Sequence, residues 1–131
     1  MNPSDLFPPT FLNFCSRKAR EMVDAGIGTR AVVLATVDGF AVAQALPDDA
    51  DSERMAALAS SISSIGAVAT QEAGLGRCTS VILNTEKGFA VVRQFAAHGH
   101  DLVVISVADE QSLLAQVMYQ ANDFVKGVLA A

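Results

Sequence analysis

The chain has 131 residues, of which 51% are hydrophobic and 18% charged, and this composition excludes an intrinsically disordered protein. Its formal net charge is −5, and no cluster of Lys and Arg forms a basic stripe, so nucleic acid is not expected as a partner. The mean hydropathy of +0.35 indicates an unusually large buried or self-associating surface.

The N-terminal residues 1–9 contain three prolines and are expected to be a lead-in to a single domain over residues 10–131. They lack a basic start followed by an apolar stretch, so no secretory signal is expected. We therefore expect a cytoplasmic location. The charge-free run from Met55 to Thr70 is shorter than the about 20 residues of a membrane helix and is rich in serine, so membrane insertion is not expected. Cys15 and Cys78 lie far apart, which fits reduced thiols.

The first part of the domain predicts a helix and a hairpin. Thr10 is expected to cap a helix whose apolar residues recur with helical spacing and which ends near Gly26. Two strands rich in Val, Ala and Leu are expected over residues 30–37 and 40–46. Asp38-Gly39 between them is the pair that a two-residue type I′ turn prefers.

The second part predicts a helix, three strands and a last helix. Asp51 or Ser52 is expected to cap a helix that runs to about Ala73, after an acidic loop. Strands are expected over residues 78–84, 89–95 and 102–107, joined by connections short enough for an antiparallel meander. Asp109 is expected to cap the last helix. Several strands are apolar at consecutive positions, so helices are expected to cover both faces of the sheet in an α/β (α+β) fold.

The second helix has two different stripes. One carries most of the large side chains and is expected to pack on the sheet: Met55, Leu58, Ile62, Ile65 and Ala69. Its neighbour has only small residues where a surface helix would carry charged ones: Ala56, Ser60, Ser63, Ala67 and Thr70. Small side chains let two helices approach closely, so we expect this small-residue stripe to pair with its copy in a symmetric dimer. The alternative is that the stripe fits under another element of the same chain or faces solvent.

Three local patterns lack the residues that their chemistry would need. Gly74-Leu75-Gly76 follows a helix and precedes a strand, whereas phosphate-binding loops join a strand to a helix. His98 and His100 are the two histidines of the chain and have no further histidine to complete a metal site. The acidic residues 48–53 lack the central glycine and late glutamate of a calcium loop. We therefore expect no enzyme activity, no catalytic residues, no cofactor and no metal.

The sequence resembles the Roadblock/dynein light chain family, which includes bacterial regulators of small Ras-like GTPases. The resemblance rests on residues 31–43 with their Asp-Gly turn, the helix start Met55-Ala56-Ala57-Leu58, and residues 81–92 and 101–109. It implies a profilin-like α-β-β-α-β-β-β-α fold, in which a five-stranded antiparallel sheet lies between the central helix on one face and the N- and C-terminal helices on the other. It also implies homodimers in which the central helices and the edge strands at residues 78–84 meet across a two-fold axis.

Together these observations predict a non-catalytic homodimeric adaptor that binds and regulates a small Ras-like GTPase. The edge strand supports pairing, because Val81-Ile82-Leu83 lacks the charges and prolines that protect a free sheet edge. The expected dimer or partner interface combines the small-residue stripe with that strand: Ala56, Ser60, Ser63, Ala67, Thr70, Cys78, Ser80 and Ile82. The alternative function is a sensor domain that binds a small molecule between helix and sheet.

Overall fold

A computed structural model describes residues 2–131 and contains a five-stranded antiparallel sheet with strand order β2-β1-β5-β4-β3. The strands are β1 (Thr29–Thr36), β2 (Ala41–Ala45), β3 (Val81–Thr85), β4 (Gly88–Ala97) and β5 (His100–Asp109). The helices are α1 (Pro3–Leu6), α2 (Pro9–Asp24), α3 (Ser52–Glu72) and α4 (Leu114–Ala130). The predicted element order and sheet are confirmed, with the short α1 as an addition.

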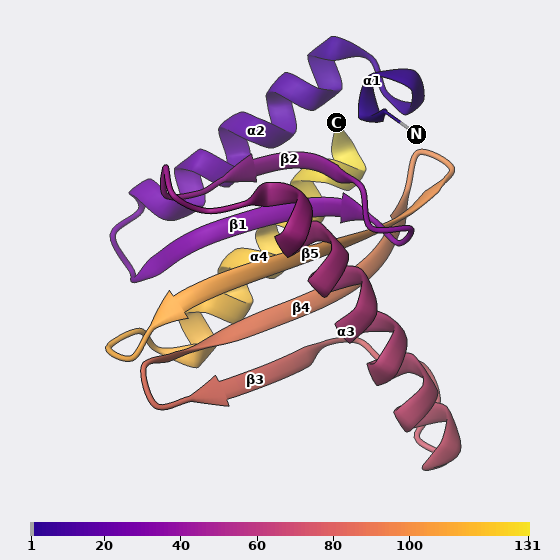
Figure 1. The fold of residues 1–131 in the computed structure, drawn as a ribbon, viewed down its shortest axis with the longest axis vertical. Helices are drawn as coiled ribbons and strands as arrows, with labels where there is room; N and C mark the ends of the chain where they lie inside the picture. The colour runs from indigo at the N-terminus through magenta and orange to yellow at the C-terminus, as the bar shows by residue number, and fades with distance from the viewer. Residues whose placement is uncertain (1) are drawn as a thin grey trace.

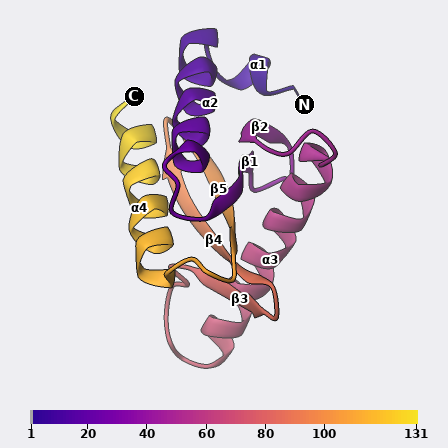
Figure 2. The same ribbon diagram turned by 90° about the vertical axis from the view of Figure 1, so that its left-hand side faces the viewer.

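Helices cover both faces of the sheet, as the apolar strands predicted (Figure 1). Figure 2 shows α2 and α4 on one side and α3 on the other. Val32 and Leu34 of β1 belong to the core under α2 and α4, whereas Val33 and Ala35 belong to the core under α3. Alternate residues of a strand point to opposite faces, so β1 is buried from both sides.

The N-terminal lead-in packs on the domain. Phe7 is buried and stacks on Phe11 of α2, with ring centroids 4.7 Å apart. The two histidines of the β4–β5 turn lie edge-on to these rings, His100 to Phe7 at 4.9 Å and His98 to Phe11 at 5.0 Å. His98 Nε2 also lies 2.9 Å from the carbonyl oxygen of Val128 near the end of α4. The turn therefore joins the first and last helices to the sheet.

Of the three predicted helix caps, the one on α3 is confirmed. The Asp51 carboxylate accepts hydrogen bonds from the backbone N–H groups of Glu53 and Arg54, at 3.1 and 3.2 Å. Thr10 does not cap α2, because that helix already begins at Pro9, where the missing proline N–H costs no helical hydrogen bond. Asp109 does not cap α4 either: it ends β5, accepts from the Ser112 hydroxyl in the following turn, and α4 begins only at Leu114.

The turn between β1 and β2 lies at Asp38-Gly39 but is longer than predicted. The Thr36 N–H donates to the Phe40 carbonyl and the Gly39 N–H donates to the Thr36 carbonyl, both at 2.9 Å. Gly39 has a positive φ of 95°, and Asp38 does not have a positive φ. A type I′ turn needs positive φ at both central residues, so the two-residue type I′ prediction is wrong.

Candidate functional site

α3 is the helix that lies on the sheet only in part. Its buried residues are Ala56, Ala59 and Ser63, and no residue of the helix after Ser63 is buried. In Figure 1 the C-terminal end of α3 extends beyond the sheet near the start of β3. The second half of α3 therefore has little of its own chain to cover it.

The side of α3 that faces the sheet is the small-residue stripe. Ala56 and Ser63 are buried in their own chain, and the Ser63 hydroxyl donates to Gln94 Oε1 of β4 at 2.7 Å. The Ser60 hydroxyl donates to the carbonyl oxygen of Val37. The expectation that this stripe is free for a partner is therefore wrong at Ala56 and Ser63, and the alternative of packing within the same chain holds there.

The close approach of α3 to the sheet explains why small residues lie there. A Cβ atom placed on Gly66 would lie 2.5 Å from Val81 Cγ2 and 3.3 Å from Cys78 Sγ. A Cβ on Gly39 of the β1–β2 turn would lie 3.5 Å from the Ala57 Cα atom. A methyl group at Gly66 would therefore force α3 or Val81 to shift, whereas one at Gly39 would make an ordinary van der Waals contact. The small residues thus let α3 approach its own sheet, by the same physics that was expected to act between two copies.

The remaining predicted interface residues lie in several environments. Ala67 and Ile82 are exposed, and Ser60, Thr70, Cys78 and Ser80 are half-buried. The Thr70 hydroxyl donates to the Gly66 carbonyl of its own helix at 3.0 Å. Within one chain these residues do not form a single exposed strip, and their role at an interface stays a prediction.

The large side chains of α3 lie on the opposite side, away from the sheet. Leu58, Ile65 and Val68 are 48%, 68% and 62% exposed. The prediction that Leu58, Ile65 and Ala69 pack on the sheet is wrong; of that stripe only Met55 and Ile62 are partly buried against the core. We call the α3 outer face the six exposed residues that follow spacings of three and four along the helix: Arg54, Leu58, Ser61, Ile65, Val68 and Glu72. Sequence reasoning grouped these residues differently because both neighbouring stripes lack charged residues.

The edge strand β3 continues this apolar surface. β3 pairs with β4 and lies at the end of the strand order, so its other edge has no strand beside it. Leu83 is exposed, and it points to the α3 side because Val81, two residues earlier, packs into the core under α3. Leu75, in the connection from α3, is 75% exposed. The α3 outer face and β3 together therefore present large apolar side chains beside an open strand edge.

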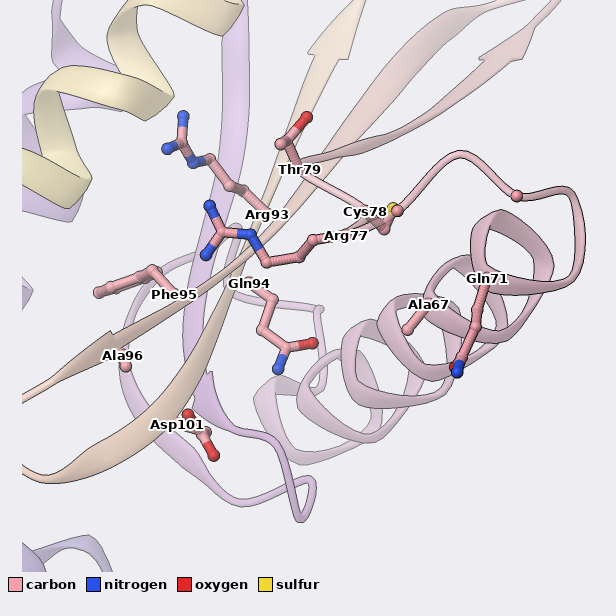
Figure 3. Close-up of a pocket in the computed structure, with 12 residues that line it drawn as sticks. Ala67, Gln71, Arg77, Cys78, Thr79, Arg93, Gln94, Phe95, Ala96 and Asp101 are labelled. Atoms are coloured by element: carbon pink, nitrogen blue, oxygen red, sulfur yellow. The ribbon is translucent and has the colours of Figure 1, made fainter.

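A cavity of about 660 Å³ lies where α3 leaves the sheet (Figure 3). It is lined by Arg93 and its neighbours in β4, by the connection around Arg77 and by Gln71 of α3. The predicted strand over 78–84 begins only at Val81, because Gly74 and Gly76 take positive φ and turn the chain so that residues 77–80 stay outside the ladder. The cavity was not predicted, although a ligand between helix and sheet was the alternative function.

The ionisable groups of residues 2–131 include no cluster of three or more His, Cys, Asp or Glu that could hold a metal ion. Burial raises the pKa of the Cys15 thiol to about 11, so this thiol is protonated at neutral pH. In the part of the chain that the structure describes, no helix is long and apolar enough to cross a membrane.

Residues 23–106 match the sequence profile of the Roadblock/LC7 domain. A crystal structure of a Roadblock/LC7 domain from Streptomyces avermitilis is 24% identical, with a TM-score of 0.76 over 86% of this chain and 92% of that chain. The gliding protein MglB from Thermus thermophilus is 15% identical, with a TM-score of 0.77 over 95% of this chain and 93% of that chain. A structure described as MglB with tetrameric arrangement is 15% identical, with a TM-score of 0.80 over 95% and 92%. No curated protein sequence matches the chain.

Proposed function

The chain belongs to the Roadblock/LC7 domain family, and from this membership we propose that it is a non-catalytic adaptor that pairs with a second copy of itself and, as a dimer, binds and regulates a small Ras-like GTPase. One observation carries the pairing. α3 turns its small side chains to its own sheet and its large apolar side chains to solvent. Apolar side chains placed in this way gain stability of about 25 cal/mol for each Å² that a partner removes from water.

The pattern of the α3 outer face favours a second copy as that partner. Its spacings of four, three, four, three and four residues are those of a coiled-coil seam. The six positions are symmetric about residue 63, so two antiparallel α3 helices with residue 63 at the two-fold axis bring matching positions together. Leu58 then lies opposite Val68 of the second copy, and Arg54 lies opposite Glu72 of the second copy. A symmetric dimer needs a surface that complements itself, and this face does so in its apolar positions and in the charges at its ends.

The open edge of β3 supports the same arrangement. Unpaired backbone N–H and C=O groups at a sheet edge form a template for another strand unless charges, prolines or covering elements block it. Val81, Ile82 and Leu83 supply no such block. A second β3 paired antiparallel across a two-fold axis would join the two sheets into one, with both α3 helices on the same face.

Charge reversal at the ends of the α3 outer face tests this register. Arg54→Glu or Glu72→Arg alone places like charges opposite each other and is expected to raise the dimer dissociation constant about two- to thirtyfold, because two symmetry-related exposed pairs are lost and each contributes about 0.2–1 kcal/mol. The double variant restores opposite charges and is expected to return towards the wild-type constant. Sedimentation velocity over a concentration series measures each value, and Arg20→Glu on the exposed side of α2 is the charge-matched control. If the dissociation constant of the double variant rises by the two single effects combined, the antiparallel register is contradicted.

The GTPase partner is supported by family membership and by the resemblance of residues 31–43, 81–92 and 101–109 to this family. The test is recovery of bound proteins from a lysate of the source cells on the immobilised chain, with a GTP analogue and with GDP. Enrichment of one Ras-like GTPase is expected, followed by a changed rate of nucleotide hydrolysis or exchange when the purified proteins are mixed. If neither nucleotide recovers a GTPase, the proposed regulation is wrong, whereas the dimer is judged by the charge reversals.

A further inference from the structure

Strand β4 is longer than the strand beside it. β3 pairs with residues 88–92 of β4, ending at the pair Val81–Val92. β4 continues through residues 93–97, which pair on their other side with β5, from Arg93–Val104 to Ala97–His100. Among residues 2–131, no strand therefore pairs with this edge of β4 over residues 93–97, a length of about 16 Å.

The cavity of about 660 Å³ lies along this open edge. Four consecutive β4 residues line it, from Arg93 to Ala96. Successive side chains of a strand point to opposite faces, so a cavity that touches all four reaches the edge of the strand. Asp101 of β5 also lines the cavity, which therefore extends from this edge over the face of β4. Figure 3 shows β4 along one side of the cavity, with α3 and the connection to Arg77, Cys78 and Thr79 along the other. The space is in line with β3, where a further strand would lie.

The charges around this edge are unequal. Arg77 and Arg93 line the cavity with a single carboxylate, Asp101, on a chain whose net charge is −5. Arg93 Nη1 donates to Asn122 Oδ1 of α4, while its buried Nε atom has no hydrogen-bond partner within residues 2–131. Asp101 pairs with Ala96, so it lies towards the β4–β5 turn, and Arg93 lies at the end next to β3. The end of the cavity next to β3 is therefore suited to an acidic group.

We propose that the open edge of β4 binds an extended segment of a partner protein as an added strand, with an acidic side chain of that segment placed at Arg77 and Arg93. Backbone hydrogen bonds to residues 93–97 supply the affinity, and the two guanidinium groups select the acidic sequence. The proposal is independent of the dimer, because the dimer uses the α3 outer face and the free edge of β3, whereas this segment pairs with residues 93–97 of β4. Failure of one leaves the other intact.

A synthetic hexapeptide with alternating valine and glutamate, acetylated and amidated at its ends, is the probe. Titration into the full-length ¹⁵N-labelled chain is expected to shift amide signals of residues 77–79 and 93–97. The same peptide with lysine in place of glutamate is expected to bind at least about tenfold more weakly. Two further glutamate peptides test for strand addition. One is N-methylated at the odd-numbered amides and the other at the even-numbered amides, so each methylation pattern blocks one edge of the extended peptide. A strand added to β4 uses one of its edges for hydrogen bonds, so the peptide in which that edge is methylated must lose binding.

Two variants and two small anions complete the test. Arg77→Glu changes an exposed side chain and is expected to weaken the peptide about tenfold, whereas Arg20→Glu on α2 leaves the affinity unchanged. No binding of the glutamate peptide at millimolar concentration would overturn the proposal. So would equal binding of both N-methylated peptides, or shifts confined to other residues. Inorganic phosphate or free glutamate binding the same residues as tightly as the peptide would instead show a small-anion site and would equally overturn strand addition.

Discussion

α2 and α3 cover opposite faces of one sheet in opposite ways. α2 buries Phe11 and Met22 among its sheet-facing residues and leaves Arg17 and Arg20 in solvent. α3 buries Ala56, Ala59 and Ser63 and leaves large apolar side chains in solvent. α2 thus has one apolar side, as a surface helix of a monomer does, whereas α3 has two.

A stripe of small residues on a helix lies where the backbone has a close neighbour, and that neighbour need not be another chain. Small residues mark the place where a helix backbone lies close to something, and for α3 that neighbour is its own sheet, as the contact of Gly66 with Val81 shows. The large residues on the other side mark the surface that remains to be covered. The argument for a second copy therefore rests on Leu58, Ile65 and Val68 and not on the alanines and serines.

The largest expected effect is on the α2 side. Phe11→Ala removes a buried ring that stacks on Phe7 and lies edge-on to His98, and is expected to lower the free energy of unfolding by about 3–5 kcal/mol. Arg20→Ala on the exposed side of α2 is the control, with an expected change within about 0.5 kcal/mol. Urea unfolding followed by circular dichroism measures both. Equal losses in the two variants would contradict the assignment of the α2 core.

A smaller effect sharpens the account of α3. Gly66→Ala places a methyl against the stiff side chain of Val81, and this overpacking is expected to destabilise the chain by about 1–3 kcal/mol. The better helix propensity of alanine offsets about 1 kcal/mol of that loss. Gly127→Ala in α4 is the matched change: its methyl has nothing nearer than Phe14 Cζ at 3.8 Å, so a gain of about 0.5–1 kcal/mol is expected. Thermal unfolding ranks the two variants. A more stable Gly66→Ala would show that α3 does not lie close to β3.

The fold was predictable from the sequence because its signals are local. Asp51 capped the helix that it was expected to cap, and the apolar runs of β1 and β5 required helices on both faces. The orientation of α3 was missed, since Ala56 and Leu58 are both apolar and neither side chain by itself says which of them faces the sheet. Gly66 was the missed signal, because a glycine inside a helix points to a close contact there. The open edge of β4 depends on where β3 begins, and that start is a tertiary property of the turn at Gly74 and Gly76.

The smallest effect concerns the two thiols, Cys15 on the buried side of α2 and Cys78 between α3 and β3. Burial under α2 raises the pKa of Cys15 to about 11 from the 9.0 of an unperturbed thiol, so the folded state disfavours its thiolate. The stability that the protonated thiol contributes is full below pH 9 and is lost as the pH rises towards 11. At a pH of about 8.5, iodoacetamide is expected to modify the half-buried Cys78 first and Cys15 only after unfolding. Mass spectrometry of peptides identifies the order, and early modification of Cys15 would contradict its burial.

If a second copy of the chain covers the α3 outer face, the particle in solution has the mass of two chains. Sedimentation equilibrium at micromolar concentration is expected to give twice the 13.7 kDa of one chain for the wild type and a single chain for Ile65→Asp. Tyr119→Asp changes a residue of similar exposure on α4 and is expected to leave the dimer intact. A monomeric wild type, or an Ile65→Asp variant that stays dimeric, would contradict the claim.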